Sequence, residues 1–325
     1  MDAPDKPESS GKPSVGSIVD DYRRARAALQ ALADEFSLRE RSFAADVESA
    51  IGDTPGADAG RDVHTLLVYC LGPFRVVLDG EPLNVLPGGR PLAVLKFLAT
   101  FGGRPTPRDL ILEAFWPEVA PSVAGNRLRV AIHSLRRMIP HHGDEIIAYK
   151  DGLYQLYPNG EVVIDADRFE AYWHLGQKLE GEGRVDEAAS AYGEAERLYR
   201  GDYLEQDLFE DWTLVRRASL RDAYLTLLLK LAVSALEQGN DAGCITRCHK
   251  ILRLDPCSEE AYQLLIVCHG RRGDRATALR WYTVCETILR HELSLTPAPA
   301  TVALRERLLA GSGPLTLTDA SPADS

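Results

Sequence analysis

The sequence predicts a mainly α-helical protein with a small β component, built from two domains and an additional N-terminal helix. Three observations support this prediction. Strand-like runs and a hairpin flank three helices between residues 64 and 166. From about Asp167 to Gly311 the apolar spacing is helical and contains a repeat. A third helical stretch, without Gly or Pro, precedes both regions.

The bulk composition is that of an ordinary globular protein. The 325 residues are enough for two domains, and hydrophobic residues make up 45% of the chain. No run reaches the length and apolarity of a membrane-spanning helix, and the N-terminus lacks the features of a secretory signal. Six cysteines are too few for a disulfide scaffold. We therefore expect a cytoplasmic protein without membrane contact.

The net charge of -11 is unevenly distributed. Between Glu161 and Asp211 there are 15 acidic residues and only 5 Lys or Arg. Nearly all of the excess negative charge therefore belongs to one segment, and the acidic total does not exclude nucleic-acid binding elsewhere.

Residues 1–16 are polar and predicted to be disordered, and residues 52–63 have the composition of a flexible linker. Between them, residues 17–51 are predicted to form one long helix. Arg39 interrupts its apolar heptad spacing. This face could form a coiled coil and produce a homo-oligomer, or it could pack on its own chain. The heptad positions are Ile18, Tyr22, Ala25, Leu29, Leu32 and Phe36.

The segment 64–166 has the element order of a winged helix-turn-helix. Strands are expected at Leu66–Leu71 and Phe74–Leu78, followed by a helix at Pro91–Phe101. Thr106 is expected to cap a second helix that has Pro107 at its first position and runs to about Trp116. A third helix begins at Pro121 and ends before Pro140. A hairpin at Ile146–Tyr157 turns at Asp151-Gly152 and would be the wing.

The third helix lies in a carboxylate-free stretch. Val119–His142 contains four arginines and three histidines but no Asp or Glu, a composition suited to a helix that approaches phosphates. Leu128, Ile132, Leu135 and Ile139 are spaced by four, three and four residues and are expected to be buried.

The opposite face of this helix is expected to bind DNA. We assign Asn126, Arg127 and Val130 to base edges in the major groove. His133, Arg136 and Arg137 are assigned to phosphates. The simpler alternative is a solvated basic face, which the capped helix before it and the hairpin after it make less attractive. The complete predicted set is Asn126, Arg127, Arg129, Val130, His133, Ser134, Arg136, Arg137 and, in the wing, Lys150.

The C-terminal region contains a repeat. Gly183, Gly239 and Gly273 occupy matching positions between paired helices. The last two are 34 residues apart, which is the tetratricopeptide (TPR) period, whereas the first two are 56 apart. We therefore expect an insertion near Gly201–Asp222. The prediction is a TPR-like α-solenoid over residues 167–311, with a disordered tail at 312–325.

The sequence gives no support for an enzyme or a cofactor. It contains neither a Walker A sequence nor the G-x-S-x-G and H-E-x-x-H motifs. Cys244, Cys248 and His249, with Cys268 and His269, could be read as a metal cluster. Their positions on repeat helices instead favour small residues at tight packing positions, and no metal is expected.

These motifs together resemble a known family. The run GGRPLAVLKFLATFGGRPTPRDLILEAFWPE, then AGNRLRVAIHSLRRMI and YKDGLYQL, resembles the winged-helix half of the Streptomyces antibiotic regulatory proteins. The stretches DADRFEAYW and FEDWTLVRRASLRDAYLTLLLKLA resemble the bacterial transcriptional activation domain that follows it. The resemblance covers roughly residues 64–311. It implies an activator that recognises short direct repeats in double-stranded DNA near a promoter and engages RNA polymerase.

Two departures from the family limit what the resemblance implies. Large members add an ATPase module, which this sequence does not contain, so nucleotide-driven regulation is not expected. The helix at 17–51 is additional to the short members and leaves the oligomeric state open. The alternative function is a TPR scaffold for protein interactions whose winged helix no longer binds DNA. Whether a DNA-binding regulator activates or represses also stays open.

Overall fold

The computed structural model describes residues 65–83, 88–138, 146–311 and 315. All of these residues belong to one compact unit, which spans residues 58–325. The predictions for residues 1–16, the heptad helix at 17–51, the linker at 52–63 and nearly all of the tail lie outside the described residues.

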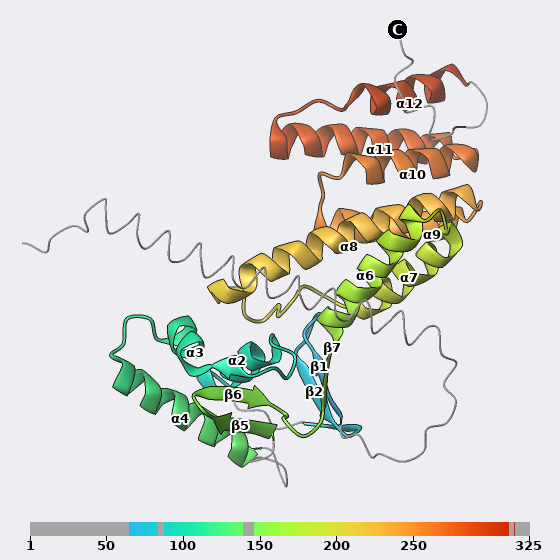
Figure 1. The fold of residues 1–325 in the computed structure, drawn as a ribbon. Helices are drawn as coiled ribbons and strands as arrows, with labels where there is room; N and C mark the ends of the chain where they lie inside the picture. Colours follow the sequence, from blue (N-terminus) through green and yellow to red (C-terminus); the bar gives the residue numbers. More distant parts are fainter. Residues whose placement is uncertain (1–64, 84–87, 139–145, 312–314, 316–325) are drawn as a thin grey trace, which may run out of the picture. The chain divides into compact units, whose positions relative to one another are not determined.

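The first sheet joins the two ends of the winged-helix region (Figure 1). Its strand order is β3 (Glu81–Pro82), β2 (Arg75–Leu78), β1 (Thr65–Tyr69) and β7 (Glu161–Ile164). The β1–β2 pair is antiparallel, as a hairpin requires, whereas β7 pairs with β1 in parallel. The sequence predicted β1 and β2. It did not predict β7, because the four residues EVVI carry no pairing information of their own.

The remainder of this region confirms the predicted winged helix-turn-helix. It contains α2 (Arg90–Ala99), β4 (Thr106–Pro107), α3 (Arg108–Phe115), α4 (Pro121–Met138), β5 (Ile147–Lys150) and β6 (Leu153–Leu156). The strands β4, β6 and β5 form a second, three-stranded sheet. Helix α2 packs on α4 and β6, and α3 packs on α4.

The predicted cap of α3 is wrong. Thr106 is fully buried in β4, where it pairs with Tyr154 of β6, and its hydroxyl donates to the carbonyl of Arg104. Pro107 becomes the N-cap, and the helix begins at Arg108 without a side-chain cap. Thr106 and Pro107 have the residue types of a helix start, but here they pair with the wing strand β6.

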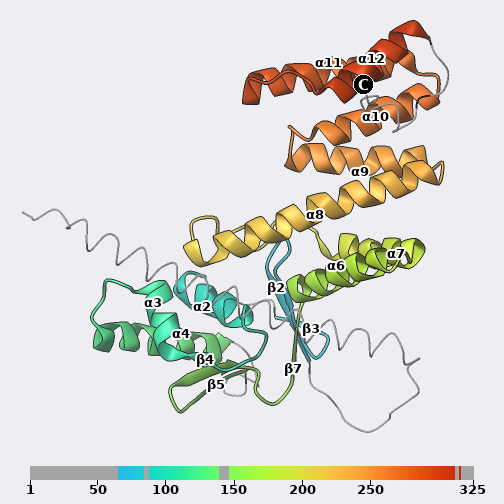
Figure 2. The ribbon, with the colours of Figure 1, turned by 45° about the horizontal axis from the view of Figure 1, so that its top comes forward.

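The C-terminal region is a series of antiparallel helix pairs (Figures 1 and 2). Helix α6 packs on α7, α8 on α9, and α10 on α11. Gly183, Gly239 and Gly273 stand between the members of the pairs with φ between 73° and 76°, a conformation that favours glycine. The helices are α6 (Asp165–Gly181), α7 (Val185–Leu198), α8 (Asp211–Glu237), α9 (Asp241–Leu254), α10 (Glu259–Arg271), α11 (Arg275–Ile288), the short η1 (Leu289–Leu293) and α12 (Pro299–Ala310).

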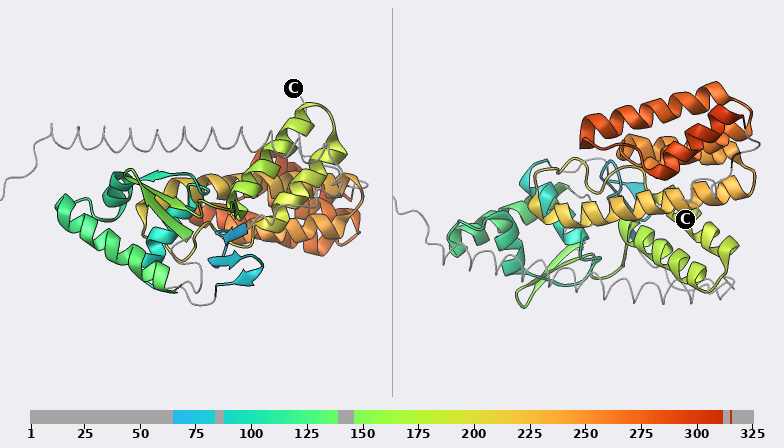
Figure 3. Two further views of the ribbon diagram at one scale, coloured as in Figure 1. Left: turned by 60° about the horizontal axis from the view of Figure 1, so that its bottom comes forward. Right: turned by 90° about the horizontal axis from the view of Figure 1, so that it is seen from above.

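Helix α8 is longer than its neighbours because it begins inside the predicted insertion. Residues 199–210 connect α7 to α8 without forming a helix, and α8 then runs for 27 residues. Figure 3 shows α8 (yellow) alongside the helices before and after it, in agreement with its contacts to α7, α9 and α10. The insertion thus adds a loop and an N-terminal extension of α8.

The cysteines of the repeat helices are packing residues. Cys244 and Cys248 of α9 and Cys268 of α10 are all fully buried, and the first two sulfur atoms lie 4.0 Å apart. Among the residues that the structure describes, no group of three or more His, Cys, Asp and Glu is placed to hold a metal ion. None of the helices in this part of the chain combines the length and apolarity needed to cross a membrane.

Candidate nucleic-acid interface and its coupling to the repeat domain

Helix α4 separates a buried stripe from an exposed basic face. Leu128, Ile132 and Leu135 are at most 4% exposed, as predicted, and Ala124 and Ala131 complete the stripe. Ile139, the fourth predicted position, lies outside the described residues. The stripe packs against α2 and α3, so the orientation of α4 is fixed by its apolar side.

Most of the predicted DNA-binding side chains lie on the exposed face of α4. Val130 is 70% exposed, an unusual exposure for an aliphatic side chain in the middle of a long helix. An aliphatic group at such a place suits the methyl group of thymine. The exposed members of the predicted set are Asn126, Arg127, Arg129, Val130, His133, Arg137 and Lys150, and the half-buried ones are Ser134 and Arg136.

The arginines of α4 differ in their contacts. Arg127 and Arg137 make no hydrogen bond or ion pair with any described residue, so their charges face solvent. Arg129 donates from Nη2 to the amide oxygen of Asn126 at 2.7 Å and thereby orients that amide. An oriented amide loses less conformational entropy when it binds a base edge.

Arg136 has a structural contact that the sequence did not indicate. Its Nη2 donates to the backbone oxygen of Ile147 at 2.6 Å. Ile147 is the first residue of β5, so this bond ties the end of α4 to the wing. The contact gives Arg136 a role in positioning the wing, in addition to the predicted role at phosphate.

The wing is a tight two-residue hairpin. Lys150 pairs with Leu153, and the intervening Asp151 and Gly152 have φ of 52° and 83°. Two positive φ values are the signature of a type I′ turn, which matches the twist of the flanking strands. The Tyr149 and Tyr154 rings pack 4.5 Å apart across the hairpin. The turn therefore holds the exposed Lys150 at the tip of a rigid element.

Gly125 of α4 leaves room for an arginine side chain of α3. A Cβ added at Gly125 would lie 2.1 Å from Nη2 of Arg108. Arg108, the first residue of α3, also donates to the backbone oxygen of Pro121 at the start of α4. The guanidinium thus fills the space that a larger residue at position 125 would occupy.

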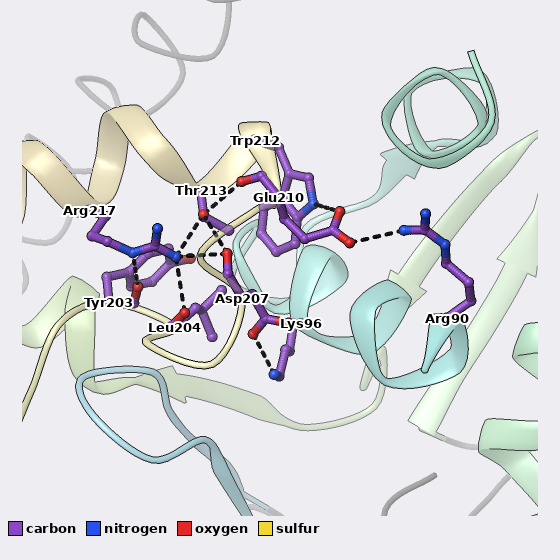
Figure 4. Close-up of polar contacts among 9 residues, drawn as sticks. All are labelled: Arg90, Lys96, Tyr203, Leu204, Asp207, Glu210, Trp212, Thr213 and Arg217. Atoms are coloured by element: carbon purple, nitrogen blue, oxygen red, sulfur yellow. Dashed lines mark hydrogen bonds and ion pairs between the residues drawn. The ribbon is translucent and has the colours of Figure 1, made fainter. Parts of the chain in front are cut away.

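The insertion of the repeat domain contacts the winged helix directly (Figure 4). Lys96 of α2 is 2% exposed, and its Nζ lies 2.5 Å from Oδ2 of Asp207 in the insertion. Arg90, at the start of α2, forms a second and more exposed ion pair with Glu210. These two bonds join the helix beneath α4 to the first part of the repeat domain.

Aromatic packing accompanies the ion pairs. The Trp212 ring lies edge-on to the Phe97 ring at 5.3 Å and close to the Phe115 ring at 6.2 Å. Such edge-to-face pairs add about 0.5–1.5 kcal/mol each beyond the area that they bury. Trp212 is the second residue of α8, so the N-terminal extension of α8 places its ring against Phe97 and Phe115.

Arg217 holds the insertion loop in shape (Figure 4). Its guanidinium donates to the backbone oxygens of Tyr203, Leu204 and Asp207 at distances of 2.7 to 3.0 Å. It also donates to the hydroxyl of Thr213 at 2.8 Å. A single planar side chain thus satisfies three loop carbonyls, a pattern that lysine cannot reproduce.

The same insertion is hydrogen-bonded to the end of β1. Leu204 donates its N–H to the oxygen of Cys70, and Leu71 and Tyr203 form an isolated antiparallel bridge. The Asp165 carboxylate accepts the N–H groups of Cys70 and Leu71 at 2.6 and 3.1 Å. Burial raises the pKa of Asp165 above its ordinary value, and these backbone bonds oppose the shift.

The C-terminal region is similar to a described family. Residues 164–309 match the family model described as the bacterial transcriptional activator domain. This match gives residues 164–309 the name activator domain below. The match begins at the last residue of β7 and ends in α12, so the activator domain contains the whole helical region and the insertion that touches the winged helix.

Several curated regulators are similar to the chain over both domains. The transcriptional regulatory protein EmbR of Mycobacterium tuberculosis is 27% identical over 248 residues, which cover 74% of this chain and 62% of EmbR. The transcriptional regulatory protein MoaR1 of the same organism is 25% identical, with 74% and 78% covered. The regulatory protein AfsR of Streptomyces griseus is 26% identical over 83% of this chain and 27% of its own length. These relatives confirm the resemblance to the antibiotic regulatory proteins.

The fold has a solved counterpart. The structure of M. tuberculosis EmbR in complex with a low-affinity phosphopeptide superposes with a TM-score of 0.60 at 24% identity, covering 79% of this chain and 68% of that one. At this identity the match shows the fold. The chain spans about 62% of the length of EmbR, the curated relative with the highest identity reported above.

The residues that join the winged helix to the activator domain were missed by sequence reasoning. Lys96 stands inside the otherwise apolar run AVLKFLA, and a cation in a buried run is a signal for a buried carboxylate partner. Its partner Asp207 is 111 residues away and is one of many acids in its segment, so the sequence alone could not select it.

Proposed function

We propose that this protein is a sequence-specific DNA-binding transcriptional regulator and that it activates transcription by contacting RNA polymerase. The observation that carries the proposal is the exposed face of α4, where Arg127 and Arg137 face solvent beside the 70%-exposed Val130. No carboxylate lies on this helix, although the chain as a whole is acidic. An exposed cationic face without carboxylates favours binding to phosphates.

The roles of the individual residues follow from their contacts. Asn126, Arg127 and Val130 are proposed to read base edges, with Arg129 orienting the Asn126 amide. Arg137, His133 and Lys150 are proposed to bind phosphates from the two ends of the interface. Arg136 is proposed to act mainly by holding the wing, because its guanidinium is bonded to Ile147.

The experiment is a binding titration on DNA from the protein's own upstream region, followed by fluorescence anisotropy at several salt concentrations. If roughly four phosphates are neutralised per protomer, the slope of log affinity against log salt is on the order of -3.6. A slope near zero would contradict the proposal. Replacing Arg137 with Ala is expected to make the slope shallower by about 0.9.

Activation and polymerase contact rest on the activator domain and on the names of the relatives, all of which are regulatory proteins. An in-vitro transcription assay with purified polymerase tests this part: added protein should raise transcript yield from a promoter that carries its site. A fall in yield would assign repression instead. The proposed function is not enzymatic and needs no cofactor.

The second candidate is a protein-interaction scaffold that no longer binds DNA. The acidic segment beginning at β7 favours it, since 15 acids against 5 basic residues would repel nearby phosphates. The same anisotropy titration separates the two functions, because a scaffold would bind neither the upstream DNA nor a scrambled duplex. The predicted helix at 17–51 is proposed to set the oligomeric state, and light scattering with and without residues 1–55 would test that.

A further inference from the structure

A cavity in the activator domain is lined by none of the residues proposed to bind DNA. It has a volume of about 390 Å³ and opens between the end of α7, the first residues of the insertion, α8 and the end of α9. This volume falls within the range of small-molecule sites, roughly 300–1,000 Å³. Its walls are contributed by two tyrosines, three cationic residues, a glycine and a leucine: Tyr199, Tyr224, Arg200, Lys250, Arg253, Gly201 and Leu254.

The aromatic wall is rigid. The rings of Tyr199 and Tyr224 are stacked 3.9 Å apart at 7°, and the Phe169 ring packs against both. The Tyr199 hydroxyl donates to Asp202 at 2.7 Å, which fixes the ring at the mouth of the insertion. A preformed aromatic and aliphatic surface, with Leu254 beside it, suits the organic part of a ligand.

The cationic wall has charge available for an anion. Arg253, in the last turn of α9, makes no hydrogen bond or ion pair within the described part of the chain. Arg200 lies over the Tyr69 ring at 5.8 Å and has no carboxylate partner among the described residues. Lys250 is bonded to Glu196, which Arg247 also contacts, so this trio keeps one positive charge.

Two further carboxylates reduce the net positive charge around the cavity. Asp202 is paired with Arg221, and the Glu205 carboxylate lies beside Gly201 at the rim. The five cations in and around the cavity therefore exceed the three carboxylates by two charges. A phosphate monoester carries nearly two negative charges at neutral pH and accepts bonds from guanidinium groups in a bidentate manner, whereas a simple carboxylate carries one.

We propose that this cavity binds a small phosphorylated organic molecule. The phosphate is held by Arg253, Arg200 and Lys250, and the organic part packs on the tyrosine wall. The ligand would touch Arg200 and Gly201, which begin the segment that is hydrogen-bonded to the end of β1. Gly72 donates to Asp202 there at 3.2 Å, and a Cβ at Gly201 would approach the Gly72 Cα within 2.9 Å. The site is thus built into the segment that connects the activator domain to the winged helix.

The test is isothermal titration of the full chain, without DNA, with phenyl phosphate as the probe. Inorganic phosphate supplies the anion without the organic part, and benzyl alcohol supplies a similar organic part without the anion. Phenyl phosphate should bind more tightly than either. Replacing Arg253 with Ala should weaken its binding at least roughly tenfold, because its charge-assisted bonds to the phosphate are lost. Arg253→Lys should weaken it less.

The matched control is Arg272→Ala, which removes an exposed arginine at the end of α10, outside the cavity. It should leave the affinity for phenyl phosphate unchanged. Three results would each overturn the proposal. One is that phenyl phosphate fails to bind at millimolar concentration, and another is that benzyl alcohol binds as tightly as phenyl phosphate. The third is that Arg253→Ala and Arg272→Ala have equal effects on the affinity for phenyl phosphate. Thermal melting of each variant shows whether it is folded, and Arg253 is exposed, so its replacement should not disturb the fold.

Discussion

The Lys96 Nζ atom lies 2.5 Å from the Asp207 carboxylate, and the lysine side chain is almost entirely buried. Lys96 belongs to the helix that packs beneath α4, and Asp207 belongs to the insertion of the activator domain. Desolvating a lysine is costly unless its charge is paired, so this contact is specific to one arrangement of the two domains. Together with Trp212 and Arg217, it makes the position of the winged helix depend on the activator domain.

Breaking this pair should destabilise the protein. Lys96→Met leaves the Asp207 carboxylate without its partner, and we expect the free energy of unfolding in urea to fall by about 2–4 kcal/mol. The double variant Lys96→Met with Asp207→Asn removes both charges and should recover part of that loss.

The control for this pair is Arg90→Gln, which breaks the neighbouring but exposed pair with Glu210. It should cost less than about 1 kcal/mol, because solvent screens that pair. Equal losses in Lys96→Met and Arg90→Gln would show that burial of the Lys96 pair does not matter.

The first helix pair of the activator domain depends on a close contact. A Cβ at Gly176 of α6 would lie 2.3 Å from Cε1 of the buried Tyr192 ring of α7. Gly176→Ala should therefore separate the two helices and cost about 1–3 kcal/mol of stability, measured by denaturant unfolding.

Gly181, in the same helix, provides the matched control. Nothing lies within 4 Å of a Cβ added there, and its backbone conformation accepts any residue. Gly181→Ala should be neutral or should stabilise the protein by about 0.5 kcal/mol. If Gly181→Ala lost as much stability as Gly176→Ala, the close contact between Gly176 and Tyr192 would not explain the effect.

The raised pKa of Tyr224 predicts that the stability of the protein falls at alkaline pH. Burial raises its pKa to about 12, and Glu196 adds to the shift. In the unfolded chain a tyrosine ionises at about pH 10. The folded state binds this proton more strongly, so the contribution of Tyr224 is complete below about pH 10 and is lost as the pH rises toward about 12.

The variant Tyr224→Phe has no such proton. The stability of the natural protein relative to this variant should therefore fall between about pH 9 and about pH 11. Urea unfolding of both proteins at the two pH values measures the difference. A pH-independent difference would mean that the Tyr224 phenol is not protected in the folded state.

Local patterns predicted much of the fold. The stripe Leu128, Ile132 and Leu135 gave the orientation of α4, the Asp151-Gly152 pair gave the wing, and the spacing of Gly239 and Gly273 gave the repeat. Each of these features is set by residues close together in the chain. The heptad helix at 17–51 lies outside the described residues and stays a prediction.

Non-local pairing accounts for what the sequence could not show. Thr106 and Pro107 have the residue types of a helix start, yet they pair with β6, which lies almost 50 residues later. The parallel partner of β1 is β7, almost 100 residues away. The 56-residue spacing between Gly183 and Gly239 predicted the insertion. It could not predict the contact with Lys96, because Asp207 is one of many acidic residues in its segment.

The central claim is that the exposed face of α4 reads DNA sequence, and Arg127→Ala tests it most directly. The measurement compares the affinities of the natural protein, Arg127→Ala and Arg272→Ala for DNA from the protein's own upstream region and for a scrambled duplex. We expect Arg127→Ala to lose about 1–3 kcal/mol on the upstream DNA and much less on the scrambled one. Arg272→Ala should change neither affinity. Equal affinity of Arg127→Ala and the natural protein for the upstream DNA would contradict the account.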